Sequence, residues 1–368
     1  MKIGIITFHY AHNYGAVLQA YALSTRLCLE GYDAKIIDLR RSFIYNQYLP
    51  LEFSYFYNNY RENNSIVLSL LKSCKCYWNN RKRNVQWKRF DKFINKQLPT
   101  TKRVYKIEDI DKLKLDVYIS GSDQIWNDKL TNGFDPLYFC NGFGVDKQKI
   151  AYAASNGSEL VEKSKLEEFN SLISNFDAIS VREKGLSDFL NANGIKSVNV
   201  LDPIFLLDKN DWAKICSPIS YSDYLLTYSF SEEPSFFSDV LDFAKLKGLK
   251  VVSILFHHRD DIDTDIIQIT DAGPMEFLAY FRNASFVITN SFHGTAFSIL
   301  NEKQFLCVPP GKARGRIDSL LKSLGLTSRI QSGQFHSDYY IDYKDVLTRL
   351  NELRASSLSF LKSNLKSK

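Results

Sequence analysis

The chain has 368 residues, of which 45% are hydrophobic and 24% charged, and its formal net charge is +6. This length predicts two domains with room for a cleft between them. The charge is too small and too dispersed to indicate nucleic-acid binding, but it suits a small anionic or phosphate-bearing substrate.

The N-terminus and the cysteines indicate a cytoplasmic protein. MKIGIITF is strand-like and lacks the charged region, apolar stretch and cleavage site of a signal peptide. No window reaches the ~18 apolar residues that span a bilayer. The six cysteines are scattered except for Cys74 and Cys76, which lie too close together for a zinc knuckle. We expect reduced thiols and no bound metal.

The first half of the chain alternates strands with helices. KIGIITF, the helical stretch AVLQAYALSTRLCLEGY and the apolar run DAKIIDL form a βαβ unit. Strands that end in polar turns follow at 115–127, 149–158, 176–183 and 198–207, with helices at 159–175 and 184–193. The alternation predicts a parallel sheet covered by helices on both faces.

Residues 40–110 interrupt this pattern. Within them, 65–97 is helical in pattern, strongly basic between Lys72 and Lys92, and carries Trp78 among its charges. One interpretation is a face for an anionic lipid or a lipid-linked diphosphate. The other is a surface helix with its aromatic side chains turned inward and its charges solvated, as in most basic amphipathic helices of soluble proteins.

The second half repeats the α/β alternation. Strands are predicted at 224–230, 250–256, 286–290 and 304–310, helices at 235–247, 274–284, 295–302 and 343–366, and a polar loop after 256. The fold class is therefore α/β with two Rossmann-like domains. The predicted units are a first domain at 1–206 with a basic, aromatic insertion at about 40–110, a second domain at 207–343, and a C-terminal helix at 344–368 that can pack back on the first domain.

Ligands of open parallel sheets bind beyond the carboxyl ends of the strands. That rule selects the turns HNYG (12–15), SGSDQ (120–124), SNGS (155–158), SVRE (180–183), LDP (201–203) and NSFHGT (290–295). Two facing sheets would bring these turns to one cleft. No complete dinucleotide fingerprint or Walker lysine loop occurs, which disfavours a nicotinamide or ATP enzyme.

Two of these turns carry groups suited to acid–base work. Asp123 could be a general base or hold a sugar hydroxyl, or it could cap the next helix. His293 lies where a helix begins, which disfavours the imidazolium, so a general acid there needs a neighbouring anion such as a bound phosphate. A structural histidine is the alternative.

Cations and a helix start could hold an anion. Arg182 at a strand end could grip a carboxylate or phosphate with two nitrogens, or form a salt bridge with Glu183. The loop PGKARGR supplies Lys312, Arg314 and Arg316, a possible anion clamp or a solvated loop. Gly15 opens a helix whose free N–H groups can bind an anion.

Taken in order, these segments resemble the polysaccharide pyruvyl transferase family. The resemblance runs through KIGIITFHYAHNYGAVLQAYAL, ISGSDQIWN, YAASNG, ISVREKG, VLDP, PMEF and ITNSFHGTAFSIL, over roughly residues 2–320. It implies two domains facing across a cleft in a GT-B-like arrangement. It also implies transfer of pyruvate from phosphoenolpyruvate to two hydroxyls of a sugar as a cyclic ketal, with release of phosphate. Members usually modify bacterial capsule, exopolysaccharide or cell-wall glycans, often on lipid-linked intermediates at the inner face of the membrane.

The resemblance also suggests roles for individual residues. It implies His293 and Asp123 as catalytic residues. The expected donor-binding residues are Arg182, Lys312, Arg314, Arg316, Ser291, Gly294 and Thr295. The expected acceptor-binding residues are Asn13, Tyr14, Gly15, Ser122, Gln124 and Asn156. No metal or cofactor is expected, with phosphoenolpyruvate as co-substrate.

The sequence departs from the family at one position and leaves two other functions open. Many members have Arg-Leu-His-Gly where this chain has Ser291-Phe292-His293-Gly294, so Arg314 or Arg316 would have to replace that arginine.

A GT-B glycosyltransferase using a nucleotide sugar would have the same fold. Such enzymes commonly place a glutamate in the second domain for the ribose, and only Glu302 follows His293 closely. A non-catalytic glycan-assembly protein is the third interpretation.

Overall fold

The structure is a computed structural model of the whole chain. It describes residues 1–45, 48, 57, 61, 64–79, 81–144, 146–231, 233–308, 314–331, 335–336 and 340–365, without the side chains of Cys76, Asn79 and Arg314.

The first domain contains a parallel six-stranded sheet in the order β2-β1-β3-β4-β5-β6. Its strands are β1 (Lys2–Ile6), β2 (Asp33–Ile36), β3 (Val117–Ser120), β4 (Gln148–Ala154), β5 (Ala178–Val181) and β6 (Val198–Asn199). Its helices include α1 (Tyr14–Leu29), α2 (Ser42–Tyr45), α6 (Ile107–Asp111), α7 (Leu166–Ile173) and α8 (Lys184–Ala192). The central strands β3 and β4 are buried almost throughout, which explains their continuous apolar sequence.

The second domain contains a parallel five-stranded sheet in the order β11-β10-β7-β8-β9. Its strands are β7 (Tyr224–Tyr228), β8 (Lys250–Ile254), β9 (Ile266–Ile269), β10 (Phe286–Thr289) and β11 (Gln304–Cys307). Its helices include α9 (Lys209–Ala213), α10 (Pro234–Leu246), α11 (Pro274–Asn283), α12 (Phe292–Leu300) and α13 (Arg314–Ser323). The prediction of a polar loop after residue 256 is wrong in part, because that segment contains the strand β9. This edge strand is only half buried, so it lacks a continuous apolar run.

Each sheet has one point where the chain reverses its direction of travel. In the first sheet the chain passes from β1 to β2 and then crosses to β3 on the other side of β1. In the second it passes from β7 through β8 to β9 and then crosses to β10. Loops after such strand pairs diverge and leave a crevice for ligands. The site should therefore involve the loops after β1, β3, β7 and β10.

The domains are packed together at α1, α5 (Arg81–Gln97) and α11. The Tyr14 ring stacks on Phe277 with centroids 4.2 Å apart, and its hydroxyl donates a hydrogen bond to the Ala272 carbonyl (2.7 Å). Arg89 Nη1 donates to the carbonyl of Asp271 (2.8 Å). One cluster of buried apolar side chains runs through both domains.

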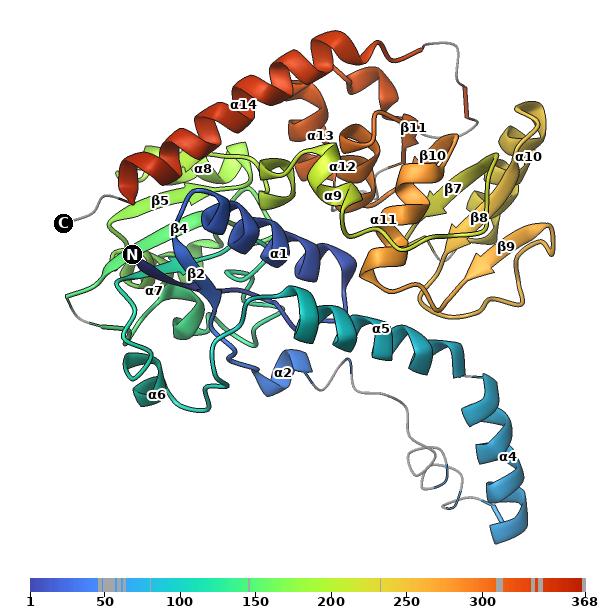
Figure 1. Cartoon of the computed structure of the whole chain (residues 1–368), viewed down its shortest axis with the longest axis horizontal. Coiled ribbons are helices and arrows are strands. Elements are labelled where there is room, and N and C mark those ends of the chain that lie inside the picture. Colours follow the sequence, from blue (N-terminus) through green and yellow to red (C-terminus); the bar gives the residue numbers. More distant parts are fainter. Residues whose placement is uncertain are drawn as a thin grey trace.

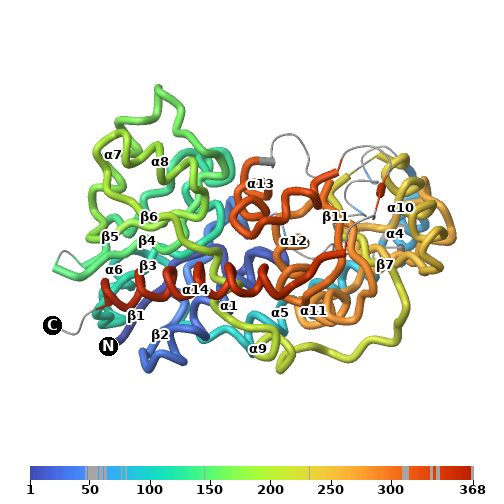
Figure 2. The backbone as a smooth tube through the Cα atoms, turned by 90° about the horizontal axis from the view of Figure 1, so that it is seen from above, coloured from blue at the N-terminus to red at the C-terminus, as the bar shows by residue number. Residues whose placement is uncertain are grey.

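The helix α14 (Tyr343–Asn364) starts at the second domain and crosses the first (Figures 1 and 2). The buried Leu201 N–H donates to Ser357 Oγ (3.0 Å), and Gln148 Nε2 donates to the Asn364 carbonyl (2.7 Å). These contacts fix α14 to the first domain.

The basic segment 65–97 forms two helices instead of one. α5 buries Phe90 and Phe93 in the first domain, whereas α4 (Ile66–Asn79) stands away from both sheets at the end of α5 (Figure 1). No helix in the described part of the chain is long and apolar enough to cross a membrane.

Candidate active site

His293 lies in the first turn of α12, at the edge of the second sheet. β10 ends at Thr289, and α12 begins at Phe292. Ser291 caps the helix, because its hydroxyl accepts a hydrogen bond from Gly294 N (3.3 Å). The positive end of the helix dipole favours a neutral imidazole at this position.

The ring of His293 rests on the backbone of Gly15, in the first turn of α1. A Cβ atom at Gly15 would overlap the Cε1 and Nδ1 atoms of the imidazole. Only glycine permits this approach. Asn13 caps α1, with its Oδ1 accepting hydrogen bonds from Gly15 N (3.0 Å) and Ala16 N (3.4 Å). The starts of two helices, one from each domain, therefore meet at His293.

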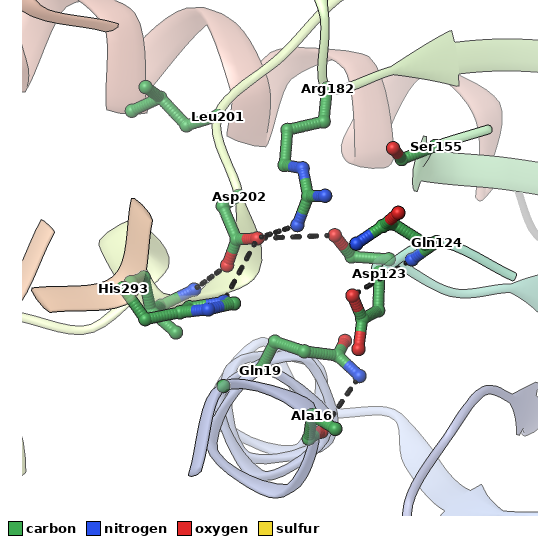
Figure 3. A network of polar contacts seen from close by, with 12 residues as sticks. Ala16, Gln19, Asp123, Gln124, Ser155, Arg182, Leu201, Asp202 and His293 are labelled. Atoms are coloured by element: carbon green, nitrogen blue, oxygen red, sulfur yellow. Dashed lines mark hydrogen bonds and ion pairs between the residues drawn. The ribbon is translucent and has the colours of Figure 1, made fainter. Parts of the chain in front are cut away.

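Asp202 connects this histidine to the first domain (Figure 3). Its Oδ2 accepts hydrogen bonds from Arg182 Nη1 (2.9 Å) and the Ser122 hydroxyl (3.4 Å), and it lies 3.8 Å from His293 Nε2. Its Oδ1 accepts from Ile204 N (3.1 Å) and so caps the short helix Pro203–Leu206. A fully buried carboxylate thus orients an arginine and faces the imidazole.

Arg182 is buried and paired with two carboxylates. Besides Asp202, it contacts Glu183 Oε1 through Nε (3.2 Å), and that oxygen also accepts a hydrogen bond from the Ser155 hydroxyl (2.7 Å). Burial disfavours the charged guanidinium, but Glu183 and Asp202 outweigh burial and raise the pKa of Arg182. The salt bridge considered as the alternative role of Arg182 therefore exists. Nη2 is still a buried donor without a hydrogen-bond partner among the described residues.

Arg316, near the start of α13, is a half-buried cation facing the same network. Its guanidinium has no hydrogen bond or ion pair in the part of the chain that the structure describes. Burial lowers the pKa of Arg316, and the nearby charge of Arg182 lowers it further. A partly desolvated cation beside a second cation creates a strong preference for an anion.

Two cavities meet at Arg316 and Phe292. The smaller, about 340 Å³, is lined by the loops of both switch points and contains Asn13, Asp123, Gln124, Asn290, Ser291 and His293. The larger, about 690 Å³, lies between α8, α13 and α14 and contains Arg182, Lys184, Asp202, Ser319 and Lys322. The smaller cavity is where the switch-point rule predicts a ligand, and His293 opens into it.

Asp123 occupies a strained backbone position in the smaller cavity. Its φ of 79° lies in the left-handed region, which is uncommon for residues other than glycine. Its Oδ1 accepts a hydrogen bond from the next residue's backbone, Gln124 N (2.8 Å), so it forms a local turn and does not cap a helix. Such strain often marks functional loops, because the fold must hold it in place.

The surroundings of His293 favour the neutral imidazole. Burial is the largest influence and lowers its pKa, whereas the carboxylates of Asp202 and Asp123 act in the opposite direction. Arg182 and Arg316 add to the lowering. A second anion in the cavity would shift this balance towards the imidazolium.

Several predicted site residues do not line either cavity. Tyr14 is buried at the domain junction, Ser122 is a buried donor to Asp202, and Thr295 is buried with its hydroxyl donating to the Ser291 carbonyl (3.0 Å). Gly294 packs closely on Thr289, and Asn156 lines a separate hollow of about 170 Å³. Lys312 and the side chain of Arg314 lie outside the described residues.

Sequence reasoning missed Asp202, Glu183 and Asn290 as site residues. Asp202 and Glu183 build the network around Arg182. Asn290 lines the smaller cavity, and its Oδ1 accepts a hydrogen bond from Phe230 N (2.8 Å), which ties together the loops after β10 and β7. All three lie in selected turns at strand ends. An acid before a proline in LDP was the available signal for Asp202.

Two parallel-sheet domains with a site at their facing switch points define a GT-B protein. Solved structures of UDP-N-acetylglucosamine 2-epimerases share this fold. The Neisseria meningitidis enzyme, bound to UDP-GlcNAc, aligns with a TM-score of 0.51 and 10% identity over 100% of this chain and 95% of its own. The Methanocaldococcus jannaschii enzyme aligns with a TM-score of 0.50 and 12% identity over 95% of this chain and 92% of its own. At this identity the likeness concerns the fold alone.

The sequence places the chain in a particular family within that class. The model of the polysaccharide pyruvyl transferase family matches residues 13–311. The chain belongs to the polysaccharide pyruvyl transferase family, which confirms the resemblance and supports a transferase of polysaccharide biosynthesis. No curated protein sequence matches the chain.

Proposed function

We propose that this protein transfers pyruvate from phosphoenolpyruvate to a sugar of a polysaccharide intermediate as a cyclic ketal. Phosphate is the second product. The reaction uses phosphoenolpyruvate as co-substrate and needs no metal or cofactor. A lipid-linked acceptor at the cytoplasmic face of the membrane is part of the proposal.

The observation that carries the proposal is the guanidinium of Arg316, which has no ion pair among the described residues and lies near His293 and Arg182. Phosphoenolpyruvate has a carboxylate and a phosphate on adjacent carbons, so its site needs more than one cationic or N–H donor. Arg316 supplies a charge that no described acid pairs with directly, and Arg182 supplies a buried donor without a described acceptor. Arg316 can therefore take over the anion contact that Ser291 cannot make.

Donor binding would prepare His293 for acid catalysis. The phosphate brings negative charge to a neutral imidazole that already faces Asp202 at 3.8 Å. This charge raises the pKa of His293 and allows the ring to take up a proton. Asp202 acts as a positioning residue, because it holds Arg182 and faces the imidazole without reaching the donor itself.

The chemical steps then follow from the cavity residues. His293 delivers a proton to the methylene carbon of phosphoenolpyruvate, which leaves an oxocarbenium-like centre at C2. A sugar hydroxyl adds to C2 and loses its proton to Asp123. The C2–O bond to phosphate breaks, and the second hydroxyl adds to C2 and closes the ketal. Asp123 passes the proton of the first hydroxyl to the departing phosphate, and the proton of the second hydroxyl restores His293. Arg316 stabilises the charge on the departing phosphate.

The position of Glu302 does not favour the nucleotide-sugar alternative. Its carboxylate forms an ion pair with Lys209 (3.2 Å) and lines neither cavity at the domain interface. A ribose-binding glutamate would have to face the cleft.

Phosphate release tests the proposal directly. The protein is incubated with phosphoenolpyruvate and panels of galactosides and mannosides, and acceptor-dependent phosphate is measured. We expect His293→Ala to abolish release and Arg316→Gln to raise the KM for phosphoenolpyruvate roughly ten- to hundredfold, the usual range for a charged hydrogen bond.

Arg349→Gln is the matched control, because Arg349 is an exposed arginine on α14 that lines neither cavity, and its loss should leave the KM unchanged. Binding of a UDP- or GDP-sugar, without any phosphate release from phosphoenolpyruvate, would overturn the proposal in favour of a glycosyltransferase.

A further inference from the structure

The helix α4 exposes apolar side chains to solvent. Ile66, Val67, Leu70, Leu71 and Trp78 are exposed and fall within one arc of the helix at 100° per residue, which we call the apolar face of α4. Val67 is 68% exposed, Leu71 64% and Trp78 66%, whereas the small polar Ser69 and Ser73, next to this arc, are buried. A surface helix normally turns its apolar stripe to the core, so this reversed arrangement indicates an external partner.

The helix α5 holds α4 at a distance from the body of the protein. Phe90, Phe93 and Ile94 of α5 are buried in the first domain, and Arg89 forms an ion pair with Asp271 of the second (3.4 Å). Figure 1 shows α4 beyond the far end of α5, clear of both sheets. The apolar face is therefore presented on an anchored arm.

Charge decides which partner fits this face. Residues 64–90 contain seven lysines and arginines and neither aspartate nor glutamate. Lys75, Arg81, Lys82, Arg83 and Lys88 are exposed. A second copy of the chain would bring the same positive charge against this face and be repelled, whereas an anionic lipid surface attracts it.

We propose that α4 lies on an anionic lipid bilayer, with its apolar face inserted at the boundary between headgroups and acyl chains. Lysine and arginine side chains of α4 and the first turns of α5 contact the lipid phosphates. Trp78 lies between the apolar face of α4 and the basic start of α5, and the Arg81 guanidinium is 4.7 Å from the centre of its ring. Tryptophan is enriched at the level of the lipid headgroups, so we expect Trp78 to lie there. This docking does not depend on the reaction that the cleft performs.

The arm also leads to the candidate active site. Gln86 Nε2 donates a hydrogen bond to the Tyr14 hydroxyl (3.0 Å), and Phe90 stacks on His12 with centroids 5.2 Å apart. His12 lies in the loop before α1, and Tyr14 is the first residue of α1, next to Gly15, against which His293 rests. If the acceptor is lipid-linked, which rests on the proposed function, α4 would bring the cleft to the membrane that carries it.

Vesicle co-sedimentation of the full chain tests the docking. We expect binding to vesicles of phosphatidylcholine containing phosphatidylglycerol, at least about tenfold weaker binding to phosphatidylcholine alone, and reversal by high salt. The double variant V67E/L71E should bind the vesicles that contain phosphatidylglycerol at least about tenfold more weakly than the unaltered protein, because it places two carboxylates in the apolar face. Both positions are exposed, so folding should not suffer.

Matched controls separate the face of α4 from general surface effects. The variant L160E/L246E also places two glutamates at exposed leucines, 62% and 84% accessible, but outside α4, and should bind like the unaltered protein. Trp78 gives an independent signal: vesicles should shift tryptophan emission to shorter wavelength, and Trp78→Phe should remove the shift.

Two outcomes would overturn the docking. One is equal or absent binding to both vesicle types. The other is a dimer, seen by light scattering, that V67E/L71E dissociates, which would make a second copy the occupant.

Phosphate release with a soluble acceptor should survive V67E/L71E. Vesicle binding without any phosphate release would refute only the proposed function, and phosphate release without vesicle binding would refute only the docking.

Discussion

Gly15 and His293 form a contact that a single methyl group would break. A Cβ atom at position 15 overlaps the imidazole, so Gly15→Ala should destabilise the protein by about 1–3 kcal/mol, as overpacking does. In a His293→Ala background the overlap is gone, and alanine should stabilise α1 by about 0.5–1 kcal/mol relative to glycine. Urea denaturation of the four proteins measures both values.

The reversal of sign is the decisive feature of this cycle, since neighbouring residues alone show such coupling. An equal effect of Gly15→Ala in both backgrounds would mean that the ring does not rest on α1. The same variant should reduce phosphate release, because His293 would be displaced.

The protonation of His293 gives a second test at a single side chain. Burial lowers its pKa below the unfolded value of about 6.5, so the unfolded chain binds more protons between the two pKa values. The contribution of His293 to stability is therefore present above pH ~6.5 and is lost as the pH falls. Titration by NMR, with the signal assigned through His293→Gln, should give a pKa under ~6.5.

The pKa of His293 should fall when a nearby negative charge is removed and rise when one is added. Asp202→Asn removes a carboxylate that raises it, so the pKa should fall further, whereas phosphoenolpyruvate should raise it. A pKa above ~6.5 in the free protein would contradict the assignment of a neutral imidazole.

The helix α14 stabilises the first domain through one buried hydrogen bond. Ser357→Ala removes the acceptor of the Leu201 N–H and leaves a buried donor unpaired. We expect a loss of about 1–3 kcal/mol in the free energy of unfolding, measured with urea. Leu201 precedes Asp202, so the variant should also weaken phosphate release.

Ser363→Ala on the same helix is the control, because its hydroxyl is exposed, donates to the Phe360 carbonyl (3.1 Å) and accepts a long hydrogen bond from Asn364 Nδ2 (3.4 Å). Its effect should stay within about 0.5 kcal/mol, as for most surface substitutions. Equal effects of the two variants would show that α14 is not held through Ser357.

The two domains should unfold together. One cluster of buried apolar side chains runs through both, and the stack of Tyr14 on Phe277 lies at their junction. Calorimetry should therefore show one transition whose calorimetric and van't Hoff enthalpies agree. Two resolved transitions would mean that the domains are energetically independent, as at smaller and more polar interdomain contacts.

The strands and helices of both sheets follow from local features of the sequence. Buried parallel strands require continuous apolar runs, and helices between them require a 3.6-residue period, so the alternation could be read directly. The prediction failed at β9, a half-buried edge strand without such a run, and at 65–97, where the structure has two helices instead of one. Because the carboxyl ends of parallel strands share one edge, the sequence also identified the turns that contain Asp123, Arg182 and His293.

The way in which those turns meet depends on contacts between distant parts of the chain. Gly15 and His293 are far apart in the chain, and no local pattern reports that the imidazole needs the space of a missing Cβ atom. The pairing of Asp202 and Glu183 with Arg182, which leaves Arg316 as the cation without a described partner, likewise depends on side chains from different loops. Local sequence governs strands and helices because their hydrogen bonds are short in range. Charge balance and burial at the site depend on long-range packing, which only the folded chain defines.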